Sequence, residues 1–137
     1  MLVHDPQGVE VVVGGERVVL RNVERVELER CAAAVVEEVG DLGPHAAFVD
    51  VVGVRTRVRI VGLGVGADLE GMMAVGARCE VMVRWLVAGM RRTLRVRGVL
   101  IAEEYGPARG GKGTGVVRAL EFAGESVDGA TDCVVVE

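Results

Sequence analysis

The stretch with the clearest potential for chemistry is glycine-rich and lies at Gly106–Gly113, G-P-A-R-G-G-K-G. It nearly matches G-x-x-x-x-G-K-[ST], the loop whose backbone amides bind phosphate groups. The hydroxyl that should reach magnesium is missing, because Gly113 follows Lys112 and Thr114 comes one place late. The next segment, Val116–Phe122, has the composition of a strand, whereas a phosphate-binding loop leads into a helix. We therefore interpret the stretch as a hairpin loop and keep a phosphate-handling enzyme as an alternative.

Histidines and cysteines form no pattern typical of a metal site or a catalytic centre. His4 and His45 are the only histidines, and neither has a neighbouring cysteine or a second histidine at ligand spacing. Cysteines most often sit as small core residues. An odd number is also compatible with a disulfide between subunits, for which Cys133 is the first candidate and Cys31 and Cys79 are the others. We expect a protein that is not an enzyme and needs no metal or cofactor.

Composition predicts one sheet-rich domain over residues 1–137. Half of the residues are hydrophobic, valine is the commonest of them, and only 3% of the chain is aromatic; branching at Cβ suits a pleated sheet. The net charge is −4, from 16 basic and 20 acidic residues that are interspersed, so no basic face for nucleic acid is expected. The apolar stretches are far shorter than the roughly 20 residues that cross a bilayer, and the N-terminus lacks a signal peptide's pattern. We expect a soluble protein with no membrane segment.

Short strands with charged outer faces would have to position any site. In Val54–Val61, V-R-T-R-V-R-I-V, β-branched residues alternate with arginines, the period of a half-buried strand. Val26–Glu29 alternates apolar residues with glutamates in the same way. Opposite charges on directly paired residues contribute roughly 0.2–1 kcal/mol each, so we expect these two segments to pair. The charged residues of these outer faces are Glu27, Glu29, Arg55, Arg57 and Arg59.

The remaining pattern predicts an all-β sandwich or barrel of about seven or eight strands with one short flanking α-helix. Cys31–Val39 fits either two helical turns or a continuing strand, Gly40–His45 fits a loop, and Gly53 fits a bulge or bend. Asp68–Val75 is the best candidate for the helix. Further strands are expected over Val9–Val13, Arg17–Leu20, Arg21–Arg30, Ala46–Val52, Cys79–Trp85, Thr93–Glu103 and Val116–Phe122.

Two stretches carry a family likeness: D-L-G-P-H-A-A-F-V-D-V at Asp41–Val51 and V-R-A-L-E-F-A-G-E-S-V-D-G-A-T-D at Val117–Asp132. They resemble the tail tube proteins of tailed bacteriophages and phage-derived particles. A hairpin is also expected at Gly14-Gly15, between the strands Val9–Val13 and Arg17–Leu20. With this hairpin and the expected helix near Leu69, the likeness covers most of the chain in element order. Its chief motif is the S-x-D-G-x-T-D ending at Ser126–Asp132; the family often continues with proline, where Cys133 stands here.

The resemblance implies a structural virion protein. Subunits of this family form hexameric rings whose sheets join into one inner barrel, and the rings stack into a hollow tube that conducts DNA into the host. Related tubes serve contractile injection systems; such proteins are not enzymes and need no cofactor. The implied partners are further copies of the chain, baseplate and tail-terminator proteins, and a sheath if the tail contracts. The implied location is the virion tail, made and assembled in the host cytoplasm.

Within such a tube, we assign the five charged residues of the paired strands to the sheet that builds the wall and the subunit interface. A net-negative subunit repeated around a ring gives an acidic channel, which repels phosphates and lets DNA pass without specific binding. The alternative is a small β-barrel module that binds a ligand or partner as a monomer or dimer. Two loops, expected at Glu37–His45 and Gly106–Gly115, would reach the adjacent subunit or the next ring. Their polar residues are Glu37, Glu38, Asp41, His45, Arg109 and Lys112.

Overall fold

A computed structural model describes the chain except for residues 63, 66–68, 70–72 and 107–115. All the regular elements in the described part are β-strands, which confirms the expected all-β class. The first strand, of three residues, was not expected from the sequence. The strands are β1 (Leu2–His4), β2 (Gly8–Val13), β3 (Glu16–Val19), β4 (Arg25–Val39), β5 (Ala46–Val61), β6 (Arg78–Val87), β7 (Met90–Gly106), β8 (Val116–Gly124) and β9 (Val134–Val136).

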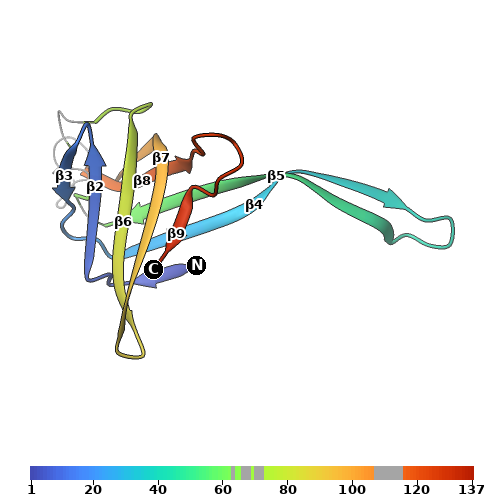
Figure 1. The fold of residues 1–137 in the computed structure, drawn as a ribbon, viewed down its shortest axis with the longest axis horizontal. Helices are drawn as coiled ribbons and strands as arrows, with labels where there is room; N and C mark the ends of the chain where they lie inside the picture. Colours follow the sequence, from blue (N-terminus) through green and yellow to red (C-terminus); the bar gives the residue numbers. More distant parts are fainter. Residues whose placement is uncertain (63, 66–68, 70–72, 107–115) are drawn as a thin grey trace.

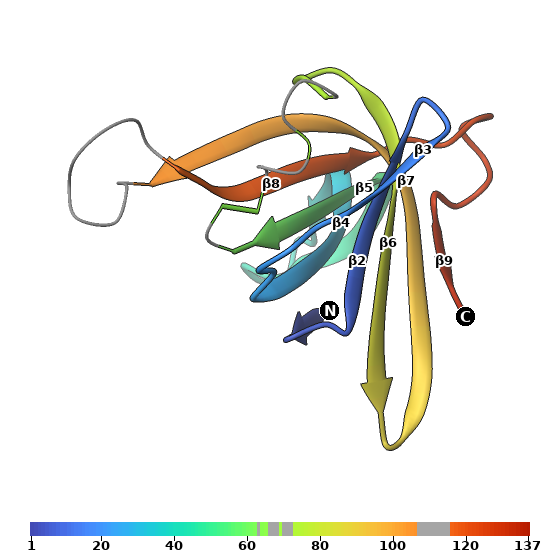
Figure 2. The ribbon, with the colours of Figure 1, turned by 90° about the vertical axis from the view of Figure 1, so that its left-hand side faces the viewer.

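All nine strands belong to one sheet, ordered β1-β4-β5-β8-β7-β6-β2-β3, with β9 paired to β7. The sheet folds over on itself, and β2 and β6 cross the direction of β4 and β5 at a steep angle (Figures 1 and 2). Strand β7 serves both halves, because it pairs β6 along its first part and β8 along its last. The core lies between the halves and includes Val9, Val11, Val26, Val58, Ile60, Val81, Val83, Leu94, Leu100, Leu120 and Phe122.

Alternation along each strand divides core from surface as the sequence predicts. In β5, Thr56, Val58 and Ile60 are buried, while the arginines between them are more exposed. Where β7 and β8 approach closely, Gly98 faces the core, and a Cβ there would overlap the carbonyl oxygen of Ala123. Only glycine fits this contact without a backbone shift.

The longest elements, β4 and β5, continue far beyond the core as a two-stranded ribbon (Figure 1). We call residues 31–54 the arm. The ambiguous Cys31–Val39 is therefore strand, and the sequence prediction of a loop over Glu37–His45 is wrong in part, because β4 runs to Val39 and β5 resumes at Ala46. Pairing keeps one register from the body outward until it shifts at Glu38. Gly53 causes no register shift but has a positive φ of 71°, consistent with the expected bend.

Two sequence predictions fall wholly or partly outside the described residues. The helix expected over Asp68–Val75 is not shown: residues 68 and 70–72 are not described, and no α-helix is assigned to the described residues of this range. The phosphate-loop likeness depends on residues 107–115, which are likewise not described. In the part of the chain that is described, no helix is both long and apolar enough to span a bilayer.

Candidate subunit interface

The arm exposes apolar side chains on both of its faces. Neighbouring residues in a strand point to opposite sides, and Val51 and Val52 are 55% and 53% exposed. Across the ribbon, Val51 is paired with Val35 on one face and Val52 with Ala34 on the other. Phe48, nearer the tip, is half exposed. Neither face of the arm is therefore covered by the described part of the chain.

The edges of the arm are also open. Strand β1 pairs β4 only over Arg25–Glu27, and β8 pairs β5 only over Arg57–Val61. In the described residues no strand pairs the arm beyond these points. Isolated two-stranded hairpins are marginally stable in water, and open edges readily pair with another chain. A partner that covered the arm would bury apolar surface worth about 25 cal/mol per Å².

The predicted pairing of the two charged strands is confirmed, and the structure supplies its register. Glu27 lies opposite Arg59, and Glu29 lies opposite Arg57, in the antiparallel pair of β4 and β5. These side chains alternate with the buried ones and so lie on the face away from the core. Arg55 is one pair further out, at the base of the arm. Their assignment to a tube wall stays a prediction.

These arginines form their ion pairs with acids of β7 and β8, and not with the glutamates of β4 that the sequence suggested. Arg57 lies 3.8 Å from the carboxylate of Glu121 in β8, and Arg59 pairs with Glu104 in β7. The sheet order explains this, because β8 lies next to β5 on the side away from β4. No local pattern in the sequence indicates that neighbour, since the link between β5 and β8 spans more than fifty residues of chain.

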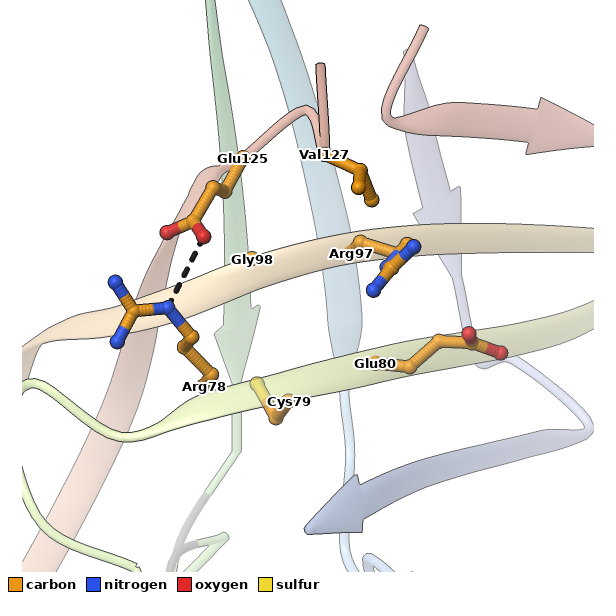
Figure 3. Close-up of a pocket in the computed structure, with 7 residues that line it drawn as sticks. All are labelled: Arg78, Cys79, Glu80, Arg97, Gly98, Glu125 and Val127. Atoms are coloured by element: carbon orange, nitrogen blue, oxygen red, sulfur yellow. Dashed lines mark hydrogen bonds and ion pairs between the residues drawn. The ribbon is translucent and has the colours of Figure 1, made fainter. Parts of the chain in front are cut away.

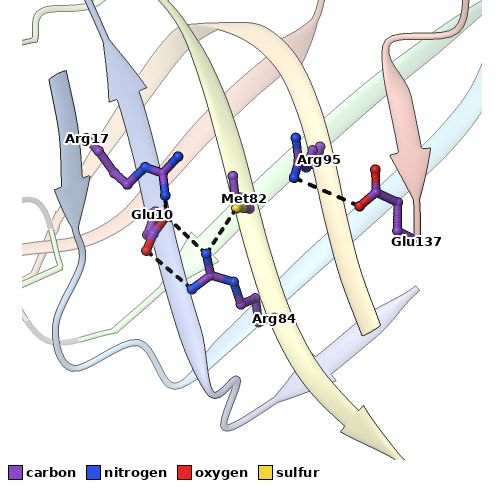
Figure 4. Close-up of polar contacts among 6 residues, drawn as sticks. All are labelled: Glu10, Arg17, Met82, Arg84, Arg95 and Glu137. Carbon is purple, nitrogen blue, oxygen red and sulfur yellow. Dashed lines mark hydrogen bonds and ion pairs between the residues drawn. The ribbon is translucent and has the colours of Figure 1, made fainter. Parts of the chain in front are cut away.

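A buried carboxylate that sequence analysis missed lies on the outward side of β2. Glu10 is nearly buried between Arg17 of β3, at 3.4 Å, and Arg84 of β6, at 3.3 Å (Figure 4). Two guanidinium groups compensate for the loss of water around this carboxylate. In the same view, Arg95 of β7 lies 3.9 Å from Glu137 beyond β9. This surface is tied together by ion pairs within the chain.

A second hairpin projects where β6 turns into β7 (Figure 2). Its turn is formed by Ala88 and Gly89, which both have positive φ. Sequence analysis missed that its tip is apolar and exposed: Leu86, Val87 and Met90 are each more than half exposed. We call residues 84–97 the basic hairpin, because every charged residue in that range is an arginine.

The segment between β8 and β9, residues 125–133, leaves the edge of the sheet and returns to it, and we call it the excursion. The amide of Glu125 donates to the carbonyl of Arg97 (3.0 Å), and the amide of Arg97 donates to the carbonyl of Cys133 (3.1 Å). Strand β9 then occupies the edge of β7 next to where β8 pairs. One residue of β7 thus binds both ends of the excursion.

The excursion contains the S-x-D-G-x-T-D motif, whose acids act as local anchors. Asp128 accepts hydrogen bonds from the amide and hydroxyl of Thr131, and these contacts hold the pKa of Asp128 well below its usual value. The amide of Val134, followed by Arg30, lowers the pKa of Asp132. Arg30 donates two hydrogen bonds to this carboxylate, at 2.9 and 3.0 Å. The motif therefore forms a turn and ties it to β4 beside the arm.

Two hollows of about 270 and 320 Å³ flank Arg97. Figure 3 shows the side chains that line the first. In the first, Arg78 donates to Glu125 at 3.0 Å. Burial raises the pKa of Cys79 to about 12, which keeps its thiol neutral and a poor nucleophile. No group of metal-ligating side chains is assembled among the described residues. The first hollow is lined by Arg78, Cys79, Glu80, Arg97, Gly98, Glu125 and Val127.

The predicted inter-subunit residues are scattered. Cys31 is exposed at the base of the arm, whereas Cys79 and Cys133 are half-buried, and all three are free thiols. The sulfur of Cys133 lies against the backbone of Gly124. A disulfide between subunits stays a prediction. Near the end of the arm, Glu37 and Glu38 lie in β4 and Asp41 and His45 in its connection to β5, while Arg109 and Lys112 lie outside the described residues.

Comparison with known proteins gives no relative. No protein-family model matches the chain, and no curated protein matches it significantly. The tail-tube interpretation therefore depends on the residue patterns and the exposed arm.

Proposed function

We propose that this protein is a structural subunit that assembles with copies of itself into stacked, hexameric rings forming a hollow tail tube. The observation that carries the proposal is the arm, a ribbon with apolar side chains on both faces and no cover from the described part of the chain. A folded body with such a projection is incomplete in water. A second copy of the same chain is the simplest partner that supplies cover to every arm.

Open strand edges support assembly through the sheet. The described part of the chain leaves β3 and β1 at the two ends of the strand order, and β9 pairs only β7. Edges of this kind pair with further chains unless they are protected. Closing a ring of copies removes edges in the way that closing a barrel does.

Charge supports the passage of DNA through the proposed tube. The subunit carries a net charge of −4. Repeated around a ring, this charge gives a negative field that repels the phosphate backbone and keeps it from adhering to the wall. The tube would guide DNA without recognising its sequence, and the proposed role needs neither catalysis nor a cofactor.

Negative-stain electron microscopy of the purified chain, with light scattering on the same sample, tests the proposal. We expect rings or hollow rods whose mass is a multiple of 14.5 kDa. A single species of one-chain mass at the highest concentration reached, with no particles on the grid, would overturn it.

The alternative, a small β-barrel binding module, draws support from the hollows beside Arg97. Their volumes approach the roughly 300 Å³ at which small-molecule sites begin. This alternative predicts a monomer or dimer whose melting temperature rises with a small ligand and no longer does so in Arg97→Ala. Assembly into rings with no such ligand effect would exclude it.

A further inference from the structure

We propose that the arm of one copy docks on the basic hairpin of another copy. The inference rests on the self-assembly proposed above and identifies the two surfaces that meet. It follows from the charge, the exposure and the positions of the two projecting hairpins.

The arm carries charge of one sign. Residues 31–54 include four acidic residues, Glu37, Glu38, Asp41 and Asp50, and no lysine or arginine. Glu37, Glu38 and Asp41 form no ion pair with any described residue, and the Asp50 carboxylate accepts the amide of its neighbour Val51. The arm thus presents unpaired negative charge beside its exposed valines.

The basic hairpin carries the opposite sign. Residues 84–97 include five arginines and no acid. Arg84 and Arg95 are paired within the chain, with Glu10 and Glu137. The side chains of the two arginines nearest the tip, at 91 and 92, form no ion pair or hydrogen bond with the described residues. They lie directly across the ribbon from Leu86 and Trp85, so charge and apolar surface are combined here as well.

The two hairpins project from different sides of the body, as Figures 1 and 2 show. An arm therefore does not reach the basic hairpin of its own chain. A contact between copies covers both apolar surfaces and pairs both sets of charges at once. Apolar burial would supply the free energy, and the charges would steer the encounter and fix the register.

The contact joins two different surfaces, so each copy has one of each to offer. Head-to-tail contacts of this kind close into rings or continue as open filaments, depending on the rotation between copies. A basic hairpin alone would also suit an acidic partner of another kind, such as duplex DNA. The arm favours the second copy, because its charge is opposite to that of the hairpin and both surfaces also expose apolar side chains.

Charge reversal tests the contact. One variant carries Glu37→Arg and Glu38→Arg, and the other carries Arg91→Glu and Arg92→Glu. Each variant alone places charges of the same sign at positions 37 and 38 of the arm and positions 91 and 92 of the hairpin, so we expect its assembled mass at a given concentration to fall at least about tenfold. An equimolar mixture should assemble again, because each arm then meets a hairpin of opposite sign.

The quadruple variant is the matched control, since it combines all four reversals and keeps the net charge of −4. It should assemble like the wild type, and circular dichroism should show the same sheet content in every variant.

The docking is overturned, and the proposed tube left intact, if both double variants assemble as well as the wild type or if their mixture fails to assemble. A wild type that never assembles overturns the proposed function instead. Loss of duplex DNA binding in Arg91→Glu/Arg92→Glu, with assembly unchanged, would assign the hairpin to DNA and also overturn the docking.

Discussion

At the scale of single residues, two glycines set how closely neighbouring segments can approach each other. A Cβ at Gly98 would overlap the carbonyl oxygen of Ala123, and a Cβ at Gly124 would lie 2.6 Å from the sulfur of Cys133. The carbonyl of Ala123 belongs to the backbone and cannot rotate away as a side chain could. The close approach of β7 and β8 at Gly98 therefore depends on the absence of a side chain.

We expect Gly98→Ala to lower the free energy of unfolding by about 1–3 kcal/mol, the usual cost of forcing atoms into a packed core. Urea unfolding followed by circular dichroism measures this. Gly8→Ala is the control, because the nearest atom to its new Cβ is the end of the Arg84 side chain at 3.9 Å. Its effect should stay within about 0.5 kcal/mol. Equal stability of the two variants would contradict the close approach of β7 and β8 at Gly98.

Residue patterns predicted which two charged strands pair but not with which residues their charges interact. The alternation of arginines in β5 and glutamates in β4 was enough to pair the strands, and the structure adds the register that places Glu27 opposite Arg59. The pairing of Arg59 with Glu104 depends on β7 and β8, which come later in the chain. Long-range neighbours of this kind leave no local pattern in the sequence.

At the scale of elements, the arm is where sequence reasoning failed most. Cys31–Val39 combines alanine and glutamate, which favour helix, with valine, which favours strand. Pairing with β5 decided the outcome. A strand that is apolar on both faces normally lies inside a protein. Its sequence cannot distinguish burial within its own chain from burial against another.

Because the arm adds nothing to the core, its removal should spare the fold. Cys31 and Arg55 are paired across the ribbon, so an Asn-Gly turn in place of residues 32–54 can join them as a hairpin. We expect a variant that unfolds cooperatively, keeps its strand signal and no longer assembles. Circular dichroism and light scattering measure the two properties. A truncated chain that still forms rings would show that assembly does not use the arm.

At the scale of the whole molecule, stability and assembly should be linked. If copies cover each other's arms, the assembled state binds only folded chains, and mass action then stabilises the fold. We expect the melting temperature to rise by a few degrees for each tenfold increase in protein concentration. Calorimetry over a hundredfold range measures this, with the armless variant as the control. A melting temperature that is constant in the wild type would argue against mutual cover.

The all-β class could be predicted from the sequence because valine-rich alternation recurs along the whole chain. The order of the strands could not. The sheet turns back on itself because β7 pairs β6 at one end and β8 at the other, which joins segments far apart in the chain. The three-residue β1 was too short to give a periodic signal.

The excursion between Glu125 and Cys133 makes the protein tolerant to change at one point. Both of its ends bind Arg97 of β7, so the pairing of the strands does not depend on how many residues lie between these ends. An engineered peptide inserted there should therefore be displayed on every copy of the chain without altering the sheet that carries it.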